Sequence, residues 1–281
     1  MVDPAASPLA GKRVVITRAP EQAEPFCHEL AARGAIPLCL PMVGFAPPAD
    51  SAALDHSLRH LAEFDWLLLT SQNAVRAVAE RCCELGVSLV DATFSAPPEG
   101  KSHGLEVAAV GPATAEAAAC AGLRVAYVAR EHRGSALAAE LGSRLQGARV
   151  LLPRSDRASA ELPGALRDAG ATVAEVAAYQ TIRVETRDDP LLDELRAGSV
   201  DVVTFFSPSA FHNLAEELGL DTLRTVRPQT AFAAIGPVTA SAMSDAGLPP
   251  EIIASEASVA SFITALTDYF LHCDRAAGER E

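Results

Sequence analysis

The chain has 281 residues, of which 49% are hydrophobic and 21% charged, so its composition is that of a globular protein of about two domains and excludes a disordered chain. Its formal net charge of −13 repels nucleic acids and anionic membranes, so a polyanionic partner would need a locally positive pocket. No apolar run reaches the ~18 residues of a membrane span, and residues 1–12 lack the basic start and apolar core of an export signal. We therefore expect a soluble cytoplasmic protein.

Short apolar segments alternate along the chain with longer amphipathic ones. The segments of strand length are 14–16, 36–40, 66–69, 107–110 and 125–128 in the first half, and 150–152, 172–176, 202–206, 231–235 and 252–254 in the second. Amphipathic patterns at 21–32 and 158–169 predict helices, each closed by a following glycine. Residues 46–49 and 95–104 are expected to be loops. The alternation predicts an α/β fold of parallel sheets with helices on both faces.

The second half of the chain repeats the first. Residues 11–35 align without gaps on residues 147–171, an offset of 136, and residues 111–123 match residues 236–248 in a later block. Residues 64–75 also match residues 200–211 at the first offset, so three blocks in the same order indicate an internal duplication. The positions related by the first offset include Arg18 and Arg154, Asp65 and Asp201, and Ser71 and Ser207.

Several signatures of cofactor and nucleotide sites are missing. The chain contains no GxGxxG motif after a strand, no GxxxxGK[ST] motif and no GxSxG motif. His56 and His60 are four residues apart on a predicted helix, but no third ligand lies at a metal-site spacing. The sequence therefore predicts neither a metal nor an organic cofactor.

Hydroxyl and amide side chains follow several strands at the place where open α/β sheets usually bind ligands. Ser71, Asn73, Ser207 and Ser209 follow two matching strands, and two Gly-Pro turns place Thr114 and Thr239 in the first turns of the next helices. A helix start carries unpaired N–H groups and about half a positive charge, so these turns could hold carboxylates or phosphates. The alternative is that the hydroxyls only cap helices.

Two arginines and a tyrosine complete the candidates. Arg18 and Arg154 lie just past the first strand of each half, where a guanidinium can hold a carboxylate through two parallel hydrogen bonds. A surface ion pair is the alternative for both. Tyr179 follows the second strand of the second half and has no counterpart in the first. A phenol can donate or accept a proton, although packing alone would also explain a tyrosine there.

The chain contains, in this order, the motifs V-x-I-T-R, FDWLLLTSQNAV, VAAVGPATAEA, VLLPRS, VAAYQT, VTFFSPSAF and AAIGPVTA. Together they resemble the uroporphyrinogen-III synthase family over about residues 11–270. The resemblance implies two flavodoxin-like lobes with parallel sheets, joined by a two-segment extended linker, with the active site in the cleft between them. It also implies that the lobes do not follow the repeat. Residues 1–42 and 180–281 would form one lobe, and residues 43–179 the other.

The resemblance further implies an enzyme of porphyrin and heme biosynthesis. In the family, hydroxymethylbilane loses its hydroxyl to give an azafulvenium cation, and closure through a spiro intermediate yields uroporphyrinogen III with ring D inverted, without a cofactor. Tyr179 matches the family's linker tyrosine and would protonate the leaving hydroxyl. Thr114 and Thr239 match the threonines of the glycine-led turns, and Ser71, Asn73, Ser207 and Ser209 fall on its side-chain-binding turns. The family leans to monomers.

Two other classes of protein fit the same pattern of residues. A non-catalytic two-lobed binding or sensor module could hold an anionic small molecule at the same positions without turnover. A duplicated scaffold for partner proteins would leave the matched Ser and Thr turns unexplained. Spacing alone does not separate the enzyme from the binding module.

Overall fold

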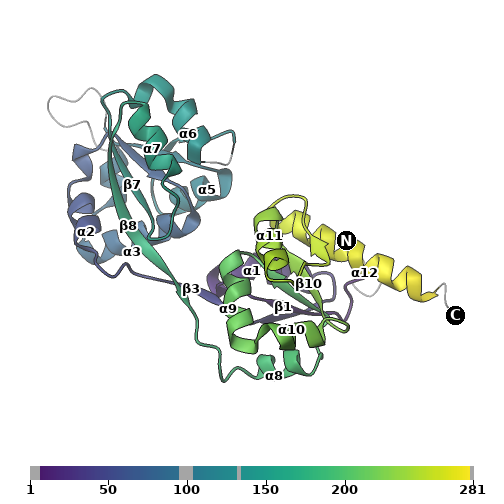
Figure 1. The fold of residues 1–281 in the computed structure, drawn as a ribbon. Helices are drawn as coiled ribbons and strands as arrows, with labels where there is room; N and C mark the ends of the chain where they lie inside the picture. Colours follow the sequence, from purple (N-terminus) through teal and green to yellow (C-terminus); the bar gives the residue numbers. More distant parts are fainter. Residues whose placement is uncertain (1–6, 95–103, 132–133, 279–281) are drawn as a thin grey trace. The chain divides into compact units, whose positions relative to one another are not determined.

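The computed structural model describes residues 7–94, 104–131 and 134–278. The chain divides into two compact units, Met1–Gly44 with Ile182–Glu281 (unit 1) and Phe45–Thr181 (unit 2). Figure 1 shows that each unit is a sheet with helices on both faces. The chain passes between the units at residues 44/45 and 181/182, two residues later in each case than the boundaries expected from the sequence.

Unit 1 is built on a five-stranded sheet in the order β11-β10-β9-β1-β2, in which all of these neighbours pair in parallel. Its strands are β1 (Arg13–Ile16), β2 (Ile36–Cys39), β9 (Val202–Phe205), β10 (Ala231–Ala234) and β11 (Ile252–Ile253). Its helices are α1 (Pro20–Ala31), α8 (Pro190–Arg196), α9 (Pro208–Leu218), α10 (Leu220–Val226), α11 (Pro237–Asp245) and α12 (Val259–Gly278).

Unit 2 carries a six-stranded sheet in the order β3-β8-β7-β4-β5-β6. Its strands are β3 (Val43–Ala46), β4 (Trp66–Leu69), β5 (Glu106–Ala109), β6 (Val125–Val128), β7 (Arg149–Ser155) and β8 (Thr172–Arg183). Its helices are α2 (Ala52–Arg59), α3 (Gln72–Leu85), α4 (Leu89–Phe94), α5 (Pro112–Cys120), α6 (Gly134–Leu141) and α7 (Glu161–Asp168), with short 3-10 turns at Leu61–Glu63 and Gly142–Leu145. The chain crosses between the units inside β3 and β8.

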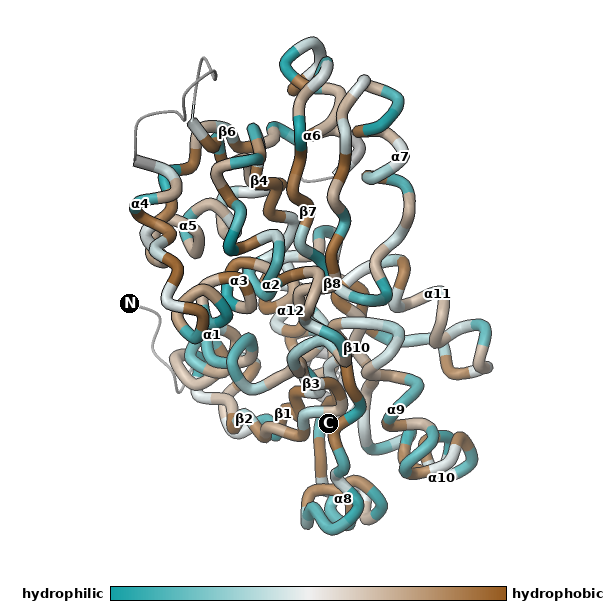
Figure 2. The backbone as a smooth tube through the Cα atoms, turned by 90° about the vertical axis from the view of Figure 1, so that its left-hand side faces the viewer, coloured by the Kyte–Doolittle hydropathy of each residue, from teal (hydrophilic) through white to brown (hydrophobic). Residues whose placement is uncertain are grey.

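Each sheet is covered on both faces because successive residues of its strands point to opposite sides. In β4, Leu67 and Leu69 pack with α2, α3 and α5, whereas Trp66 and Leu68 pack with α6 and α7. In unit 1, α8 to α11 cover one face, and α1 and α12 cover the other. The strands β4 and β7 accordingly each contain a hydrophobic stretch in Figure 2, in contrast to the mixed colours of α7 and α8. Within the described residues no helix combines the length and apolar character needed to cross a membrane.

The sheet orders show that each unit mixes the two halves of the duplication. Unit 1 places β1, from the first half, beside β9 from the second, and unit 2 places β7, from the second half, beside β4 from the first. Reciprocal hydrogen bonds connect the exchanged strands. Asp201 accepts from the backbone N–H of Arg13, and Asp65 accepts from the backbone N–H of Arg149, each at 2.8 Å. Asp65 and Asp201, which are equivalent positions of the repeat, therefore each bind the first strand of the opposite half.

Several boundaries differ from those expected. Strand β3 covers Val43–Ala46, so residue 46 is in a strand and the predicted loop is confined to residues 47–49, where the prolines interrupt hydrogen bonding. Strand β8 continues to Arg183, well past residue 176. The sequence pattern did not predict this extension because the second half of the strand is only partly buried and lacks a continuous apolar run. Helix α7 begins at Glu161 and not at residue 158. Of the predicted loop 95–104, only residue 104 lies within the described residues.

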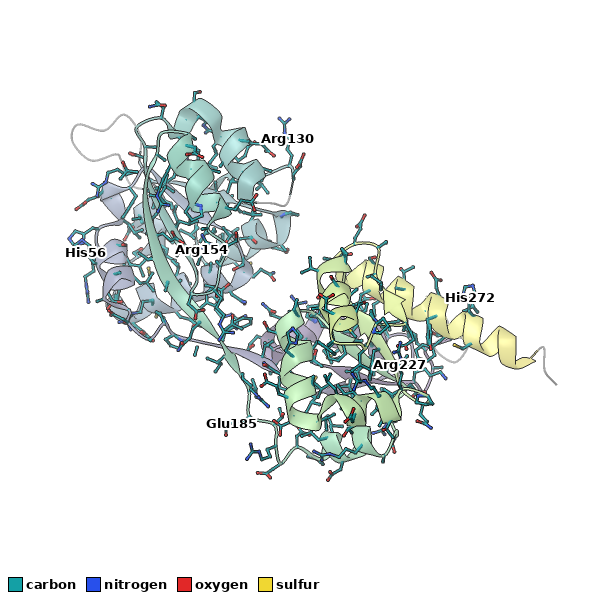
Figure 3. The ribbon with its side chains drawn as sticks, viewed as in Figure 1. His56, Arg130, Arg154, Glu185, Arg227 and His272 are labelled. Atoms are coloured by element: carbon teal, nitrogen blue, oxygen red, sulfur yellow. The ribbon has the colours of Figure 1, made fainter. Side chains whose placement is uncertain are left out.

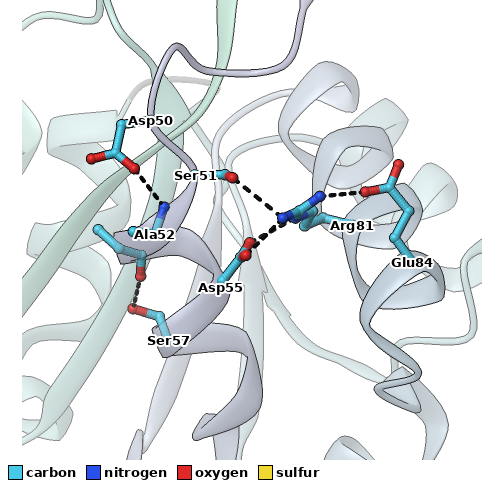
Figure 4. A network of polar contacts seen from close by, with 8 residues as sticks. Asp50, Ser51, Ala52, Asp55, Ser57, Arg81 and Glu84 are labelled. Carbon is cyan, nitrogen blue, oxygen red and sulfur yellow. Dashed lines mark hydrogen bonds and ion pairs between the residues drawn. The ribbon is translucent and has the colours of Figure 1, made fainter.

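Helix α3 of unit 2 is anchored to α2 by a network around Arg81 (Figure 4). Arg81 Nε and Nη2 each donate to one carboxylate oxygen of Asp55 at 2.6 Å, and Nη2 also contacts Ser51 Oγ at 3.3 Å. This hydrogen-bonded pair holds the pKa of Asp55 below its ordinary value. The fork geometry orients α3 relative to α2.

We predict that Asp201→Ala destabilises unit 1 without destabilising unit 2. The variant loses the hydrogen bond to Arg13 N and the 3.7 Å ion pair with Lys12, but Asp201 is about a third exposed, so we expect a loss of about 1 kcal/mol in the free energy of unfolding. Trp66, the one tryptophan, is buried in unit 2. Denaturant unfolding followed by circular dichroism should shift while Trp66 fluorescence should not, and equal shifts of both probes would contradict the prediction.

Candidate functional site

The carboxyl edge of the unit 2 sheet collects two helix starts. After β4, Ser71 caps α3 by accepting a hydrogen bond from Ala74 N at 3.1 Å, as the sequence predicted for this residue. After the neighbouring strand β5, Gly111 begins α5 without a side-chain cap. Gln72 Nε2 donates to Ala113 O at 3.4 Å, which connects the first turns of the two helices. The two helix starts therefore present their positive ends side by side.

Tyr179 reaches this edge from β8. Its Oη lies 3.2 Å from Ser71 Oγ, although the two residues are 108 positions apart in sequence. The ring of Tyr179 is held edge-on by Phe45 of β3, with 5.6 Å between ring centroids. The structure thus brings two of the predicted site residues into direct contact at the start of α3.

A bulge in β8 turns Tyr179 toward α3. Val176 and Ala178 point into the core that α3 covers, and Val173 packs against the core on the opposite face, so strict alternation would send Tyr179 to the opposite face. The pairing with β7 shifts between Arg154 and Ser155, which pair with Ala177 and Tyr179 respectively. The extra residue returns the tyrosine ring to the α3 side, where it packs against that core.

Unit 1 has a matching edge at the ends of β1, β9 and β10. Ser207 caps α9 by accepting from Ala210 N at 3.2 Å, with backbone angles nearly identical to those of Ser71. Gly236 begins α11 without a side-chain cap, as Gly111 does for α5. Parallel neighbours end at the same edge, so the starts of α1, α9 and α11 lie together in this unit.

Arg18 lies at the unit 1 edge without a carboxylate partner among the described residues. Its Nε donates to Gln22 Oε1 at 2.9 Å, and its guanidinium lies over the ring of Phe206, 5.0 Å from the centroid. Burial lowers the pKa of Arg18 from its ordinary value. A desolvated cation whose neighbours are an amide and an aromatic ring is suited to bind an anion.

Arg154, the counterpart of Arg18, is already paired within unit 2. It is 6% exposed, its Nη1 donates to Glu175 Oε1 at 3.1 Å, and its Nη2 donates to the backbone oxygen of Ser159. Figure 3 shows Arg154 within the unit, whereas Arg130 projects from its surface. Glu175 lies opposite Leu152 in the sheet, and the equivalent position opposite Ile16 in unit 1 is Cys39. The duplicated arginines therefore differ because only one of them faces a carboxylate.

The other predicted site residues lie at the same two edges. Thr114 and Thr239 are in the first turns of α5 and α11, and their side chains are buried, with exposures of 7% and 3%. Asn73 and Ser209 hold the second positions of α3 and α9 and are half-buried. Binding roles for these four residues, and for Arg154, stay predictions.

Sequence reasoning did not select Phe45, Phe206 or Gln22, although each contacts a selected residue. Phe206 directly precedes Ser207, so its place in the VTFFSPSAF motif could have been noticed. Phe45 had no such signal because its strand is short and runs into prolines. Within the described ranges, no three His, Cys, Asp or Glu side chains come together as a metal site. The rings of His56 and His60 contact each other at a tilt of 35°, with 4.4 Å between centroids.

These observations define a class: a duplicated α/β protein with two mostly parallel sheets, whose strand ends carry capped helix starts, a half-buried arginine and a tyrosine–serine pair. The family model described as Uroporphyrinogen-III synthase HemD matches residues 24–264. The chain belongs to the uroporphyrinogen-III synthase family, as the sequence motifs predicted.

Curated relatives are similar over most of their length. The chain is 32% identical over 240 residues to a protein named uroporphyrinogen-III synthase from Synechococcus elongatus, which covers 84% of this chain and 86% of that protein. It is 30% identical over 240 residues to a putative uroporphyrinogen-III synthase from Methanothermobacter thermautotrophicus, covering 84% and 90%.

Solved structures share the fold. The uroporphyrinogen-III synthetase of Helicobacter pylori superposes with a TM-score of 0.62 at 15% identity, covering 92% of this chain and 99% of that one. A mutant uroporphyrinogen III synthase of Thermus thermophilus superposes with a TM-score of 0.55 at 21% identity, covering 96% and 100%. The predicted α/β fold with parallel sheets is confirmed.

We predict that replacing the two arginines changes stability to different extents. Arg154→Met leaves Glu175, which is 38% exposed and lies 3.7 Å from Arg167, without its main partner, so we expect a loss of about 2 kcal/mol in the free energy of unfolding. Arg18→Met removes a desolvated charge and should change stability by less than about 1 kcal/mol. Denaturant unfolding of both variants would test the contrast, and equal losses would contradict it.

Proposed function

We propose that this chain catalyses the uroporphyrinogen-III synthase reaction, in which hydroxymethylbilane loses water and closes with its last ring inverted. Membership of the family supports the proposal. The observation in the structure that carries it is the contact between Tyr179 Oη and Ser71 Oγ at the start of α3. The contact supports a role for Tyr179 as a proton donor beside the positive end of a helix.

Ser71 is oriented to support Tyr179 as the acid. Its Oγ already accepts from Ala74 N, so its own hydroxyl hydrogen is free to be donated to Tyr179 Oη. The phenol hydrogen of Tyr179 is then available to the leaving hydroxyl of the substrate. When that proton is transferred, water departs, the substrate becomes a cation, and the negative charge on the phenolate is stabilised by Ser71 and the α3 N-terminus.

The proton returns later in the reaction. After the spiro intermediate has broken its bond to the preceding ring and the last ring has turned over and reclosed there, the reclosed pyrrole loses a proton to regain its aromatic ring. Transfer of that proton to the phenolate restores Tyr179. The reaction is therefore a net dehydration that consumes no electron donor or acceptor.

The acetate and propionate groups of the substrate would bind at the strand ends. The helix starts at Gly111 and Gly236 have no side-chain cap, so their N–H groups are not occupied by their own cap residue. Arg18 adds a cation that no carboxylate of the described residues neutralises. These donors explain how a chain with a net charge of −13 could hold a polyanionic substrate.

In this proposal the chain acts as a monomer in the cytoplasm. The tyrosine–serine pair comes from one chain, and so do the residues around Arg18. Sedimentation equilibrium of the purified protein tests whether the chain is a monomer, and a mass of two chains would contradict this.

The proposed function is tested with freshly prepared hydroxymethylbilane. The products are oxidised, and the two porphyrin isomers are separated and quantified. We expect the inverted isomer to form faster than the spontaneous closure gives the uninverted one. Recovery of only the uninverted isomer, at the rate measured without protein, would refute the proposed synthase activity. Binding of the bilane without turnover would instead identify a binding module.

We predict that Tyr179→Phe lowers kcat severalfold to about a hundredfold with the fold intact, because the variant keeps the ring against Phe45 and loses only the proton donor. Tyr127→Phe is the matched control. Tyr127 also belongs to unit 2 and donates to Glu140 at 2.6 Å, on the outer strand β6. Rate measurements should separate the two variants, and an unchanged rate for Tyr179→Phe would remove it from the mechanism.

We predict that Arg18→Gln raises KM by about tenfold with a smaller change in kcat, because a charge-assisted hydrogen bond to a substrate carboxylate is lost in the ground state and the transition state alike. Arg33→Gln is the control, since Arg33 follows the same helix α1 and pairs with Glu29 on the surface. Steady-state kinetics of both variants would test this. Equal KM values for the two would contradict a substrate contact at Arg18.

A further inference from the structure

Unit 1 holds two cysteines in contact with each other. Cys27 lies on α1, and Cys39 is the last residue of β2. Their Sγ atoms are 3.6 Å apart. Cys39 is exposed and Cys27 is half-buried, so the pair can be reached by small molecules from solvent.

The fold places the two thiols together through the β1–α1–β2 crossover. Cys39 pairs with Ile16 of β1 in parallel register, and Ile16 points to the sheet face that α1 covers. Alternation therefore puts Cys39 on the same face as α1, whereas Leu38 points to the other face. Cys27 lies at the border of the core under α1. Packing does not explain Cys39, because its side chain is exposed at an edge strand.

We propose that Cys27 and Cys39 form a reversible dithiol–disulfide site that exchanges with low-molecular-weight disulfides of the glutathione class. Closing the bond requires the sulfur atoms to approach from 3.6 Å to about 2.0 Å, which small side-chain rotations can supply. The closed form would tie α1 to the end of β2, four residues before the segment Val43–Ala46 in which the chain passes from unit 1 to unit 2.

The two thiols have different parts in the exchange. Burial raises the pKa of Cys27 to about 12, with further contributions from its hydrogen bond and charge interaction with Cys39 and from Glu24. Exposed Cys39 therefore attacks first as the thiolate, forming a mixed disulfide and releasing one glutathione thiolate. The mixed disulfide at Cys39 removes the hydrogen bond and charge interaction that help to raise the pKa of Cys27. Cys27 then attacks Cys39 Sγ and releases the second glutathione thiolate, so two protein thiols are oxidised and one disulfide is reduced.

The experiment equilibrates the full-length chain with defined mixtures of reduced and oxidised glutathione, traps free thiols by alkylation, and identifies linked peptides by mass spectrometry. We expect a Cys27–Cys39 link with an equilibrium constant at least about tenfold larger in the native protein than in denaturant, because the fold holds the thiols together. Cys27→Ser should stop at a mixed disulfide on Cys39. Cys120→Ser, which removes another exposed thiol, should leave the link unchanged.

Two outcomes would overturn the site. One is that the native chain accumulates only mixed disulfides with glutathione. The other is that the Cys27–Cys39 link forms with the same equilibrium constant in native and denatured protein, which would show proximity in sequence and no contribution from the fold. Neither outcome bears on the proposed synthase activity, because that proposal assigns no role to either cysteine.

Discussion

The constraint on which the rest of the structure depends is that a parallel strand must be followed by a crossover, so the next helix begins at the edge where the strand ends. Each such start leaves backbone N–H groups without helical partners. The helix starts of this chain differ in how these groups are used. Ser71 and Ser207 each accept a hydrogen bond from one N–H with their own hydroxyl, whereas Gly111 and Gly236 have no side chain to do so. The glycine-led starts are therefore the better anion donors, and the serine-led starts are the better places to orient another side chain.

The sequence predicted features that depend on local chemistry. The strands, the caps at Ser71 and Ser207 and the duplication follow from nearby residues, because capping and alternation act over a few positions. The exchange of β1 and β7 between units does not follow from the repeat, since both halves have the same pattern whichever strand each one joins. Only the family resemblance indicated it. The bulge beside Ser155 was also hidden, because one extra residue in a long strand leaves the hydrophobic pattern almost unchanged.

The duplicated arginines occupy equal positions but have different surroundings. One difference in the neighbouring strand separates them: Glu175 pairs with Arg154, while the matching position near Arg18 is Cys39. A buried guanidinium with a carboxylate partner mainly specifies local structure, whereas one over an aromatic ring keeps its charge available. Within the described residues, divergence after duplication thus left one edge with an arginine that no carboxylate pairs and the other with a tyrosine.

In the proposed reaction, rate and isomer choice would depend on different groups. Loss of the hydroxyl precedes the choice of ring carbon, so a donor such as Tyr179 accelerates both closures equally. Formation of the inverted isomer requires the inverting closure to be favoured over the closure without inversion. A hundredfold preference corresponds to a difference of about 2.7 kcal/mol between the transition states of the two closures. One or two charge-assisted hydrogen bonds of about 1.5–3 kcal/mol could supply this if the substrate carboxylates meet them only in the inverting conformation. The selectivity would then be distributed over backbone N–H groups at several helix starts, which explains why no side-chain motif in the sequence stands out as its source.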